Sequence, residues 1–183
     1  QRQEQEPQAA AGRRTRPHLR YLLKQFTRAH HMPGLEDLYR EIILDHYRTP
    51  RNRGELDPPA VSAEGYNPLC GDEIRVFVIV KNGVVSDVRF NGSGCSISQS
   101  STSMMTTAIK GKSVDEVRKI VRRFKHMMTI DETESDDTTP IDESLNLGDL
   151  EALQGVVKFP VRIKCATLGW NTLLDALEAS PRP

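Results

Sequence analysis

Apolar residues recur at helical spacing in the first clearly patterned segment of the chain, residues 35–47. Leu35, Leu38 and Ile42 fall on one side of a helix, and charged residues occupy positions between them. Pro50 follows this segment and disfavours helical backbone at the residue before it. The pattern therefore predicts an amphipathic helix over residues 35–47 that ends before Pro50.

Alternation of side chains between two faces, typical of a strand, is clearest at residues 73–80. The dipeptide Asn82-Gly83 follows, and it is the strongest short signal for a two-residue hairpin turn. We therefore predict an antiparallel hairpin whose return strand covers residues 84–90. Cys70 precedes the first strand and Cys95 follows the second, so the hairpin is expected to bring these two cysteines close together.

Three further helices are predicted in the second half of the chain. The first covers residues 96–109, directly after Cys95. The second covers residues 114–127, and its start is marked by the capping box formed by Ser113 and Glu116. Pro160 suits the first turn of the third, a final helix that carries Cys165.

Two segments between these helices lack a helical pattern. Residues 129–146 are rich in Asp and Glu and are predicted to form an exposed acidic loop, and residues 155–159 are predicted to be loop or a short strand. The composition, 37% hydrophobic and 27% charged, is ordinary for a globular protein. No apolar run approaches the roughly 20 residues that a membrane-spanning helix needs, so we expect no membrane partner.

The net charge of zero conceals an uneven distribution. Residues 1–31 carry seven Lys and Arg against two Asp and Glu, whereas the rest of the chain carries 18 basic and 23 acidic residues. We interpret residues 1–34 as a basic, mostly disordered leader or extension, and residues 35–180 as one domain. An organellar transit peptide is the alternative for the leader. The acidic charge of the domain argues against a nucleic-acid partner.

The three cysteines, Cys70, Cys95 and Cys165, stand in three separate sequence contexts. An odd number excludes a complete disulfide framework, and sparse cysteines of this kind favour a reducing, cytoplasmic environment. Three thiols are one ligand short of a four-cysteine metal site, and Asp72 could complete a tetrahedral zinc shell. Because zinc-bound thiolates remain nucleophiles, the set indicates a metal site, sulfur chemistry, or both.

Each of these residues also has a simpler interpretation. A single cysteine is most often a small buried apolar residue, which the apolar neighbours of Cys165 favour, and Asp72 could simply cap a turn. His46 and His126 are other candidate ligands. His46 lies at a helix end and fits a structural hydrogen-bonding role, whereas His126 suits the negative end of a helix dipole.

Four blocks of sequence, taken in order, strongly resemble the IscU/NifU-like family of iron–sulfur cluster assembly proteins, and within it the SufU branch. The resemblance covers about residues 35–178. Scaffold-type IscU proteins carry a ligand His where this chain has Lys164, and the stretch 111–147 fits an insertion found in SufU-type proteins. The blocks are Leu38-Tyr39 with Ile43-Leu44-Asp45-His46-Tyr47 and Pro50-Arg51-Asn52; Asn67-Pro68-Leu69-Cys70-Gly71-Asp72; Gly92-Ser93-Gly94-Cys95-Ser96-Ile97-Ser98; and Phe159-Pro160-Val161-Arg162-Ile163-Lys164-Cys165-Ala166.

The resemblance implies an α+β fold, with a small antiparallel β-sheet packed against helices. It also implies a zinc ion held by Cys70, Asp72, Cys95 and Cys165. The implied activity is that of a sulfurtransferase, in which Cys70 accepts persulfide sulfur from a SufS-type cysteine desulfurase and passes it toward a downstream Suf cluster scaffold. Asp72 and Arg162 would support catalysis beside Cys70.

Two other functions remain open at this stage. The first is a scaffold on which a [2Fe-2S] cluster is assembled, with iron or a cluster in place of zinc. Lys164 argues against it, because a protonated amine cannot bind metal. The second is a structural zinc module, against which Asp72 argues, because structural sites are usually closed by Cys and His.

Overall fold

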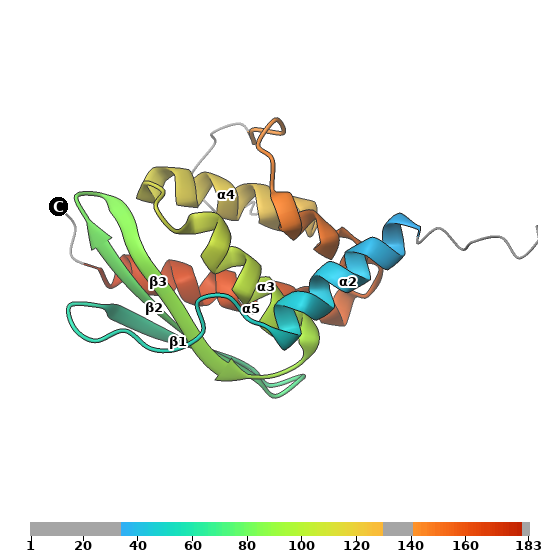
Figure 1. The fold of residues 1–183 in the computed structure, drawn as a ribbon, viewed down its shortest axis with the longest axis horizontal. Helices are drawn as coiled ribbons and strands as arrows, with labels where there is room; N and C mark the ends of the chain where they lie inside the picture. The colour runs from blue at the N-terminus through green and yellow to red at the C-terminus, as the bar shows by residue number, and fades with distance from the viewer. Residues whose placement is uncertain (1–33, 130–140, 181–183) are drawn as a thin grey trace, which may run out of the picture. The chain divides into compact units, whose positions relative to one another are not determined.

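The computed structural model describes residues 34–129 and 141–180 (Figure 1). The interpretation of residues 1–34 as a leader, and most of the acidic loop predicted within 129–146, therefore fall outside the described residues. Within those residues the elements are α2 (Leu35–Arg48), β1 (Val61–Asn67), β2 (Asp72–Lys81), β3 (Val84–Ser93), α3 (Ser96–Ile109), α4 (Val114–Met127), the 3-10 helix η1 (Gly148–Lys158) and α5 (Pro160–Glu178).

Among the described residues, three antiparallel strands form one sheet in the order β1-β2-β3. The predicted hairpin is confirmed as β2 and β3. Its turn uses Asn82 and Gly83 at φ 52° and 74°, the left-handed conformation that such a turn requires. β3 continues past the predicted end to Ser93, which pairs with Glu73 at the opposite end of the hairpin from the turn.

β1 was not predicted from the sequence, and its packing shows why. Its side chains alternate between partly buried and exposed positions, as in an ordinary edge strand. However, its partly buried positions include the small residues Ala63 and Gly65, so the hydrophobic alternation is weak. A Cβ atom at Gly65 would lie 2.1 Å from Thr172 Oγ1 of α5, so the small residue permits a close helix-to-strand contact.

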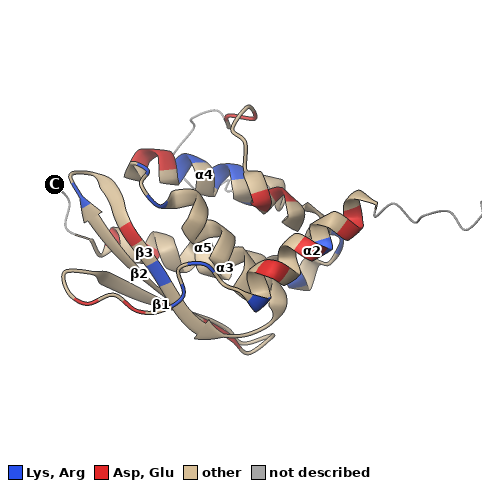
Figure 2. Cartoon of the chain, in the orientation of Figure 1, with Lys and Arg blue, Asp and Glu red and all other residues tan. Residues whose placement is uncertain are grey.

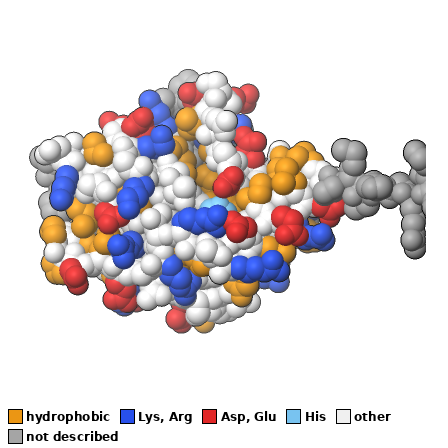
Figure 3. Space-filling view, in the orientation of Figure 1, with side chains coloured by type: hydrophobic (Ala, Val, Ile, Leu, Met, Phe, Trp, Pro, Cys, Tyr) orange, Lys and Arg blue, Asp and Glu red, His pale blue; other side chains and the backbone are white. Residues whose placement is uncertain are grey.

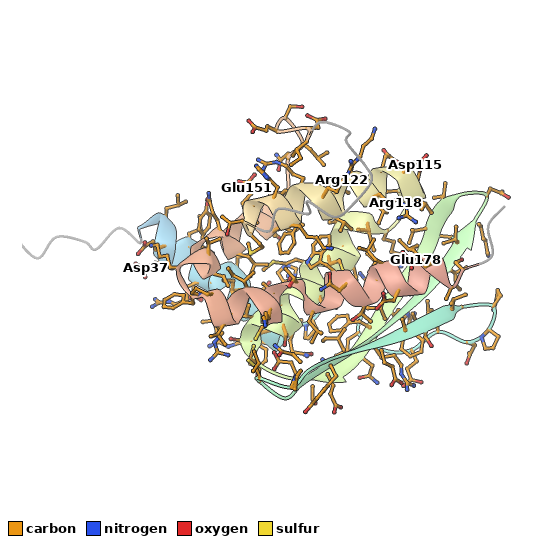
Figure 4. All side chains as sticks on the ribbon, turned by 180° about the vertical axis from the view of Figure 1, so that it is seen from behind. Asp37, Asp115, Arg118, Arg122, Glu151 and Glu178 are labelled. Carbon is orange, nitrogen blue, oxygen red and sulfur yellow. The ribbon has the colours of Figure 1, made fainter. Side chains whose placement is uncertain are left out.

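α3 and α5 pack against one face of the sheet, and α4 lies beyond them, on the side away from the strands (Figures 1 and 4). Alternate apolar residues of β2, including Ile74, Val76 and Val78, enter the core between the sheet and the helices. Trp170 of α5 stacks on Phe124 of α4 with ring centroids 4.4 Å apart. The Trp170 Nε1 group also donates a hydrogen bond to Ser101 Oγ of α3 at 3.1 Å.

The predicted helices are confirmed, with one correction between α4 and α5. Both sides of the predicted capping box are present at Ser113 and Glu116. The interpretation of residues 155–159 as loop or short strand was wrong, because residues 155–158 complete η1. Among the described residues, no helix combines the length and the apolar character needed to cross a bilayer.

Charged and apolar groups are unevenly placed on the described surface. Figure 2 shows Lys and Arg along α4, and Figure 4 labels two of them, Arg118 and Arg122. In the space-filling view, hydrophobic side chains are exposed over α2 (Figure 3). Leu35 and Leu38 of this helix are 63% and 52% exposed, so its first turn leaves part of the predicted apolar face uncovered.

Candidate functional site

Three separate segments bring the predicted site residues together at one end of the sheet. Cys70 lies in the β1–β2 turn, Asp72 begins β2, Cys95 precedes α3, and Cys165 lies in α5. One ligand atom each from Cys70, Asp72 and Cys165 lies within 4.8 Å of the others. The Sγ atom of Cys95 lies 3.3 Å from Asp72 Oδ2. The structure therefore brings two thiols and one carboxylate together, with the third thiol, that of Cys95, beside the carboxylate.

The turn that carries Cys70 is closed by backbone hydrogen bonds to the end of β1. The carbonyl oxygen of Asn67 accepts from the backbone N–H groups of Cys70 at 3.2 Å and Gly71 at 2.8 Å. Gly71 has a φ of 67°, a left-handed conformation that glycine adopts without strain. The Cys70 thiol lies near the ligand atoms of Asp72 and Cys165, and the residue is half-buried, so it remains partly accessible.

Asp72 is 1% exposed and points toward the start of α3. Its Oδ1 accepts from the backbone N–H of Cys95 at 2.8 Å. Burial raises the pKa of Asp72, but hydrogen bonds from the Cys95 backbone and from nearby side chains outweigh burial and leave this pKa below its usual range. The residue is therefore an ionised carboxylate that holds the Cys95 segment, which is more than a simple turn cap.

Glycines allow the segment before Cys95 to approach Asp72 closely. Gly92 and Gly94 have φ values of 136° and 155°. A Cβ atom at Gly92 would lie 2.1 Å from the Glu73 carbonyl oxygen, and one at Gly94 would lie 2.6 Å from Asp72 Oδ1. Cys95 itself occupies the N-cap position of α3.

Cys165 is the buried member of the set, with 0% of its surface exposed. Its thiol donates to Cys70 Sγ across 3.1 Å. Burial raises the pKa of Cys165, and hydrogen bonding to Cys70 and Asp72 raises it further. The donor set itself, two thiols and a carboxylate whose ligand atoms lie within 4.8 Å of one another, is suited to a bound metal ion.

The cluster opens into a surface pocket of about 690 Å³ that Cys70, Asp72, Cys95 and Arg162 help to line. The pKa of Arg162 is raised by its hydrogen bond with Cys165 and by the charges of the three cysteines, so this cation belongs to the site. The rim of the pocket is apolar and exposed: Leu69 is 62%, Phe159 is 61% and Val161 is 57% exposed.

The two histidines considered as ligands lie elsewhere. His46 is buried, and its ring nitrogens lie 2.9 Å from Ser103 Oγ and 3.2 Å from Asp149 Oδ2, which confirms its structural role. His126 stands in the last turn of α4, as predicted. Neither residue belongs to the cysteine cluster.

Sequence reasoning missed two residues that support the site. Asn67 donates from Nδ2 to Cys165 Sγ at 3.6 Å, and its place at the start of the Asn-Pro-Leu-Cys block was the available signal. Arg53 donates to the Gly92 carbonyl oxygen at 2.6 Å and to Gln99 Oε1 at 2.8 Å, which ties together the two sides of the Cys95 turn. No local pattern points to Arg53, because its partners are 39 and 46 residues away.

The sequence of this chain matches the family model of the NifU-like N-terminal domain over residues 38–166. The chain belongs to this family. It is 48% identical over 140 residues to the zinc-dependent sulfurtransferase SufU of Bacillus subtilis, a match that covers 76% of this chain and 89% of that protein.

Scaffold proteins of the family are also similar to this chain. The iron–sulfur cluster assembly scaffold protein IscU of Streptococcus pyogenes is 38% identical, over 80% of this chain and 86% of its own length. A solved structure of a candidate SUF-system scaffold from Fervidobacterium islandicum matches with a TM-score of 0.63 and 32% identity, over 79% of this chain and 99% of the other. These matches confirm the predicted family and α+β fold.

Proposed function

We propose that this chain is a zinc-dependent sulfur carrier that accepts persulfide sulfur from a SufS-type cysteine desulfurase for iron–sulfur cluster assembly. The supporting observation is that Cys70, Asp72 and Cys165 converge, that Cys95 lies beside Asp72, and that an open pocket is lined by Cys70, Asp72, Cys95 and Arg162. The similarity to a relative named as a zinc-dependent sulfurtransferase supports the same function. The functional unit is the domain of residues 35–180, and a downstream Suf cluster scaffold would receive the sulfur.

The donor set fits zinc, which accepts both thiolate sulfur and carboxylate oxygen in a four-ligand shell. Cys70, Asp72, Cys95 and Cys165 would hold the ion. When bound, it would keep the thiols deprotonated at neutral pH. The arrangement is consistent with this fit, because the ligand atoms of Cys70, Asp72 and Cys165 all lie within 4.8 Å of one another.

Among the three cysteines, Cys70 best suits the role of sulfur acceptor. It is half-buried, lies in a glycine-containing turn and lines the open pocket. Cys165 is fully buried within α5, and Cys95 is held through its backbone by Asp72. An acceptor has to reach a second protein, and a turn that lines the pocket meets that requirement better than a helix interior.

The transfer step is a thiol–disulfide type of exchange. The Cys70 thiolate attacks the terminal sulfur of the desulfurase persulfide, and a new S–S bond forms on Cys70. The original S–S bond breaks, and its electron pair remains on the desulfurase cysteine as a thiolate. Arg162 lies where it can offset the negative charge of the arriving persulfide, and Asp72 holds Cys95 in place during the exchange.

The scaffold function is the second candidate, because several relatives carry that name. Lys164 argues for the carrier. It is an exposed cation one residue before Cys165, and a protonated amine cannot serve as a cluster ligand. An open pocket with an apolar rim is expected of a site that contacts a partner protein. It is not expected of a closed structural zinc module.

The test is cysteine desulfurase turnover with zinc-loaded and with chelated protein, followed by mass spectrometry of its cysteine peptides. We expect stimulation only by the zinc-loaded form, and one added sulfur on the peptide that contains Cys70. Cys70→Ser should abolish stimulation while the fold persists. A persulfide found mainly on Cys95 or Cys165, or a brown cluster-holding protein after anaerobic reconstitution, would favour the scaffold instead.

A further inference from the structure

Asn67, the last residue of β1, connects two parts of the cysteine cluster. It is 5% exposed. Its carbonyl oxygen accepts from the N–H groups of Cys70 and Gly71, and its side-chain Oδ1 accepts from the N–H of Leu69 at 3.2 Å. Its side-chain Nδ2 donates to Cys165 Sγ, which lies 98 residues further along the chain. A single buried residue thus shapes the turn of Cys70 and contacts the sulfur of Cys165.

The orientation of the Asn67 amide follows from its partners. The backbone N–H of Leu69 is a donor, so it requires the amide oxygen on its side. The NH₂ group is then left facing Cys165 Sγ at 3.6 Å. A hydrogen bond donated to sulfur lowers the energy of the lone pairs through which that sulfur would bind a metal.

We propose that Asn67 is a positioning residue of the metal site. It sets the backbone of the Cys70 turn, and through its amide it orients the Cys165 sulfur and donates a hydrogen bond to the lone pairs that would bind the metal. This inference rests on the proposed function, in which Cys70 and Cys165 share a metal ion. It assigns to Asn67 an electronic effect on one sulfur in addition to its structural role in the turn.

The discriminating variant is Asn67→Asp. Aspartate has nearly the same shape and keeps an acceptor for the Leu69 N–H, so the turn can close as before. It replaces the donor that faces Cys165 Sγ with a carboxylate oxygen. The Cys165 thiolate then loses a hydrogen bond and gains a neighbouring negative charge, both of which raise the energy of its lone pairs.

Cobalt(II) is the probe, because it takes the place of zinc and its thiolate-to-metal charge-transfer absorption reports on the sulfurs. Metal-free protein is titrated with Co²⁺, and both the affinity and the band position at saturation are recorded. The carboxylate of Asn67→Asp also attracts the Co²⁺ ion, so the affinity is recorded and the band position decides. At saturation the band of Asn67→Asp should move to longer wavelength than that of the wild type.

Asn91→Asp is the matched control. Asn91 lies near the end of β3, its Oδ1 accepts from the N–H of Gly92 at 2.9 Å, and its Nδ2 donates to Glu55 at 3.3 Å. The chemical change is therefore the same, but the partner of the amide is an oxygen instead of a sulfur. This control should keep the wild-type band position. Circular dichroism and melting of the metal-free proteins check that each variant folds.

The outcomes are distinct. If the absorption band of Asn67→Asp stays at the wild-type position, the proposal is overturned, even if the affinity falls. A purely structural role of Asn67 would weaken metal binding without changing the energy of the Cys165 lone pairs. If Asn67→Asp does not fold, Asn67→Ala removes the same donor and should give a smaller shift in the same direction. A wild-type protein that binds no Co²⁺ would instead refute the metal site of the proposed function.

Discussion

Two tight turns join the three strands, and they are built in different ways. The β2–β3 turn consists of Asn82 and Gly83 in left-handed backbone, and the carbonyl oxygen of Gly83 also accepts from the backbone N–H of Val114 at 2.9 Å. The β1–β2 turn closes on Asn67, whose side chain reaches Cys165 in α5. The β2–β3 turn could be predicted from its own two residues. The contact between the β1–β2 turn and α5, a helix near the far end of the chain, could not be predicted in that way. The cysteine cluster includes the β1–β2 turn, whose contact with Cys165 forms only when α5 packs against the sheet.

The largest effect that separates the two turns should come from Cys165→Ser, which removes the buried sulfur that contacts the β1–β2 turn. Zinc content should fall strongly and the melting temperature should drop, because metal binding adds to the free energy of folding. Hydrogen exchange at the Gly71 amide should accelerate, while exchange around the Asn82-Gly83 turn should stay slow. Metal analysis after gel filtration, thermal melts and exchange mass spectrometry measure these three changes.

Cys95→Ser offers a comparison for that result. It should also lose zinc, but it leaves the contact between Asn67 and Cys165 intact. Full zinc retention in both serine variants would contradict the ligand assignment.

A smaller effect is expected from Asp72→Ala, which removes one ligand and the acceptor of the Cys95 N–H while three sulfurs remain. Zinc affinity, measured by competition with a chelator, should fall, and desulfurase stimulation should fall with it, without unfolding of the chain. Asp87→Ala is the control at the hairpin, where Asp87 pairs with Lys110 at 2.6 Å. If Asp72→Ala binds zinc as the wild type does, Asp72 serves only to hold the Cys95 segment.

Gly71→Ala and Gly83→Ala compare the two turns directly. Both glycines have left-handed backbone, with φ values of 67° and 74°, and a Cβ at either would meet none of the described atoms within 4 Å. Each substitution should therefore reduce the free energy of unfolding by about 1 kcal/mol. Denaturant unfolding measures this cost. Only Gly71→Ala should also slow sulfur transfer, and equal transfer rates in the two variants would show that the Cys70 turn tolerates distortion.

The smallest effect is expected from removing residues 1–31, so that the protein starts at Met32. Every group assigned to the site lies within residues 35–180, and α2 begins at Leu35. The shortened protein should keep its zinc content and its stimulation of the desulfurase. A loss of either would show that the basic segment takes part in the reaction.

Local signals were sufficient for some elements and insufficient for others. The hairpin follows from Asn82-Gly83, and the start of α4 follows from its capping box, because both depend on residues adjacent in sequence. β1 has a weak hydrophobic pattern because Gly65 has to be small where Thr172 of α5 packs against the strand, so the strand is recognisable only in the folded structure. The 3-10 helix η1 was missed for a related reason: its short turns are fixed by burial of residues such as Leu150 and Leu153.

The site could be predicted in part. The hairpin alone brings Cys70 near Cys95, but no spacing rule connects Cys165 to them. The count of three thiols suggested that it belongs to the same site, and the family resemblance implied it as a ligand. The roles of Asn67 and Arg53 could not be predicted, because their contacts are with residues distant in sequence. The candidate metal ligands could be identified from the sequence. The residues that hold these ligands in position could be identified only from the structure.

The stacked pair formed by Trp170 and Phe124 gives the protein an intrinsic optical reporter. Trp170 is the single tryptophan of the chain, it is fully buried, and it lies on the same helix as Cys165. Its indole is fixed by Phe124 of α4 and by Ser101 of α3, so its emission depends on how α5 is seated against both helices. Fluorescence can therefore follow, without any added label, whether loading the cysteine cluster tightens the helix that carries its buried thiol.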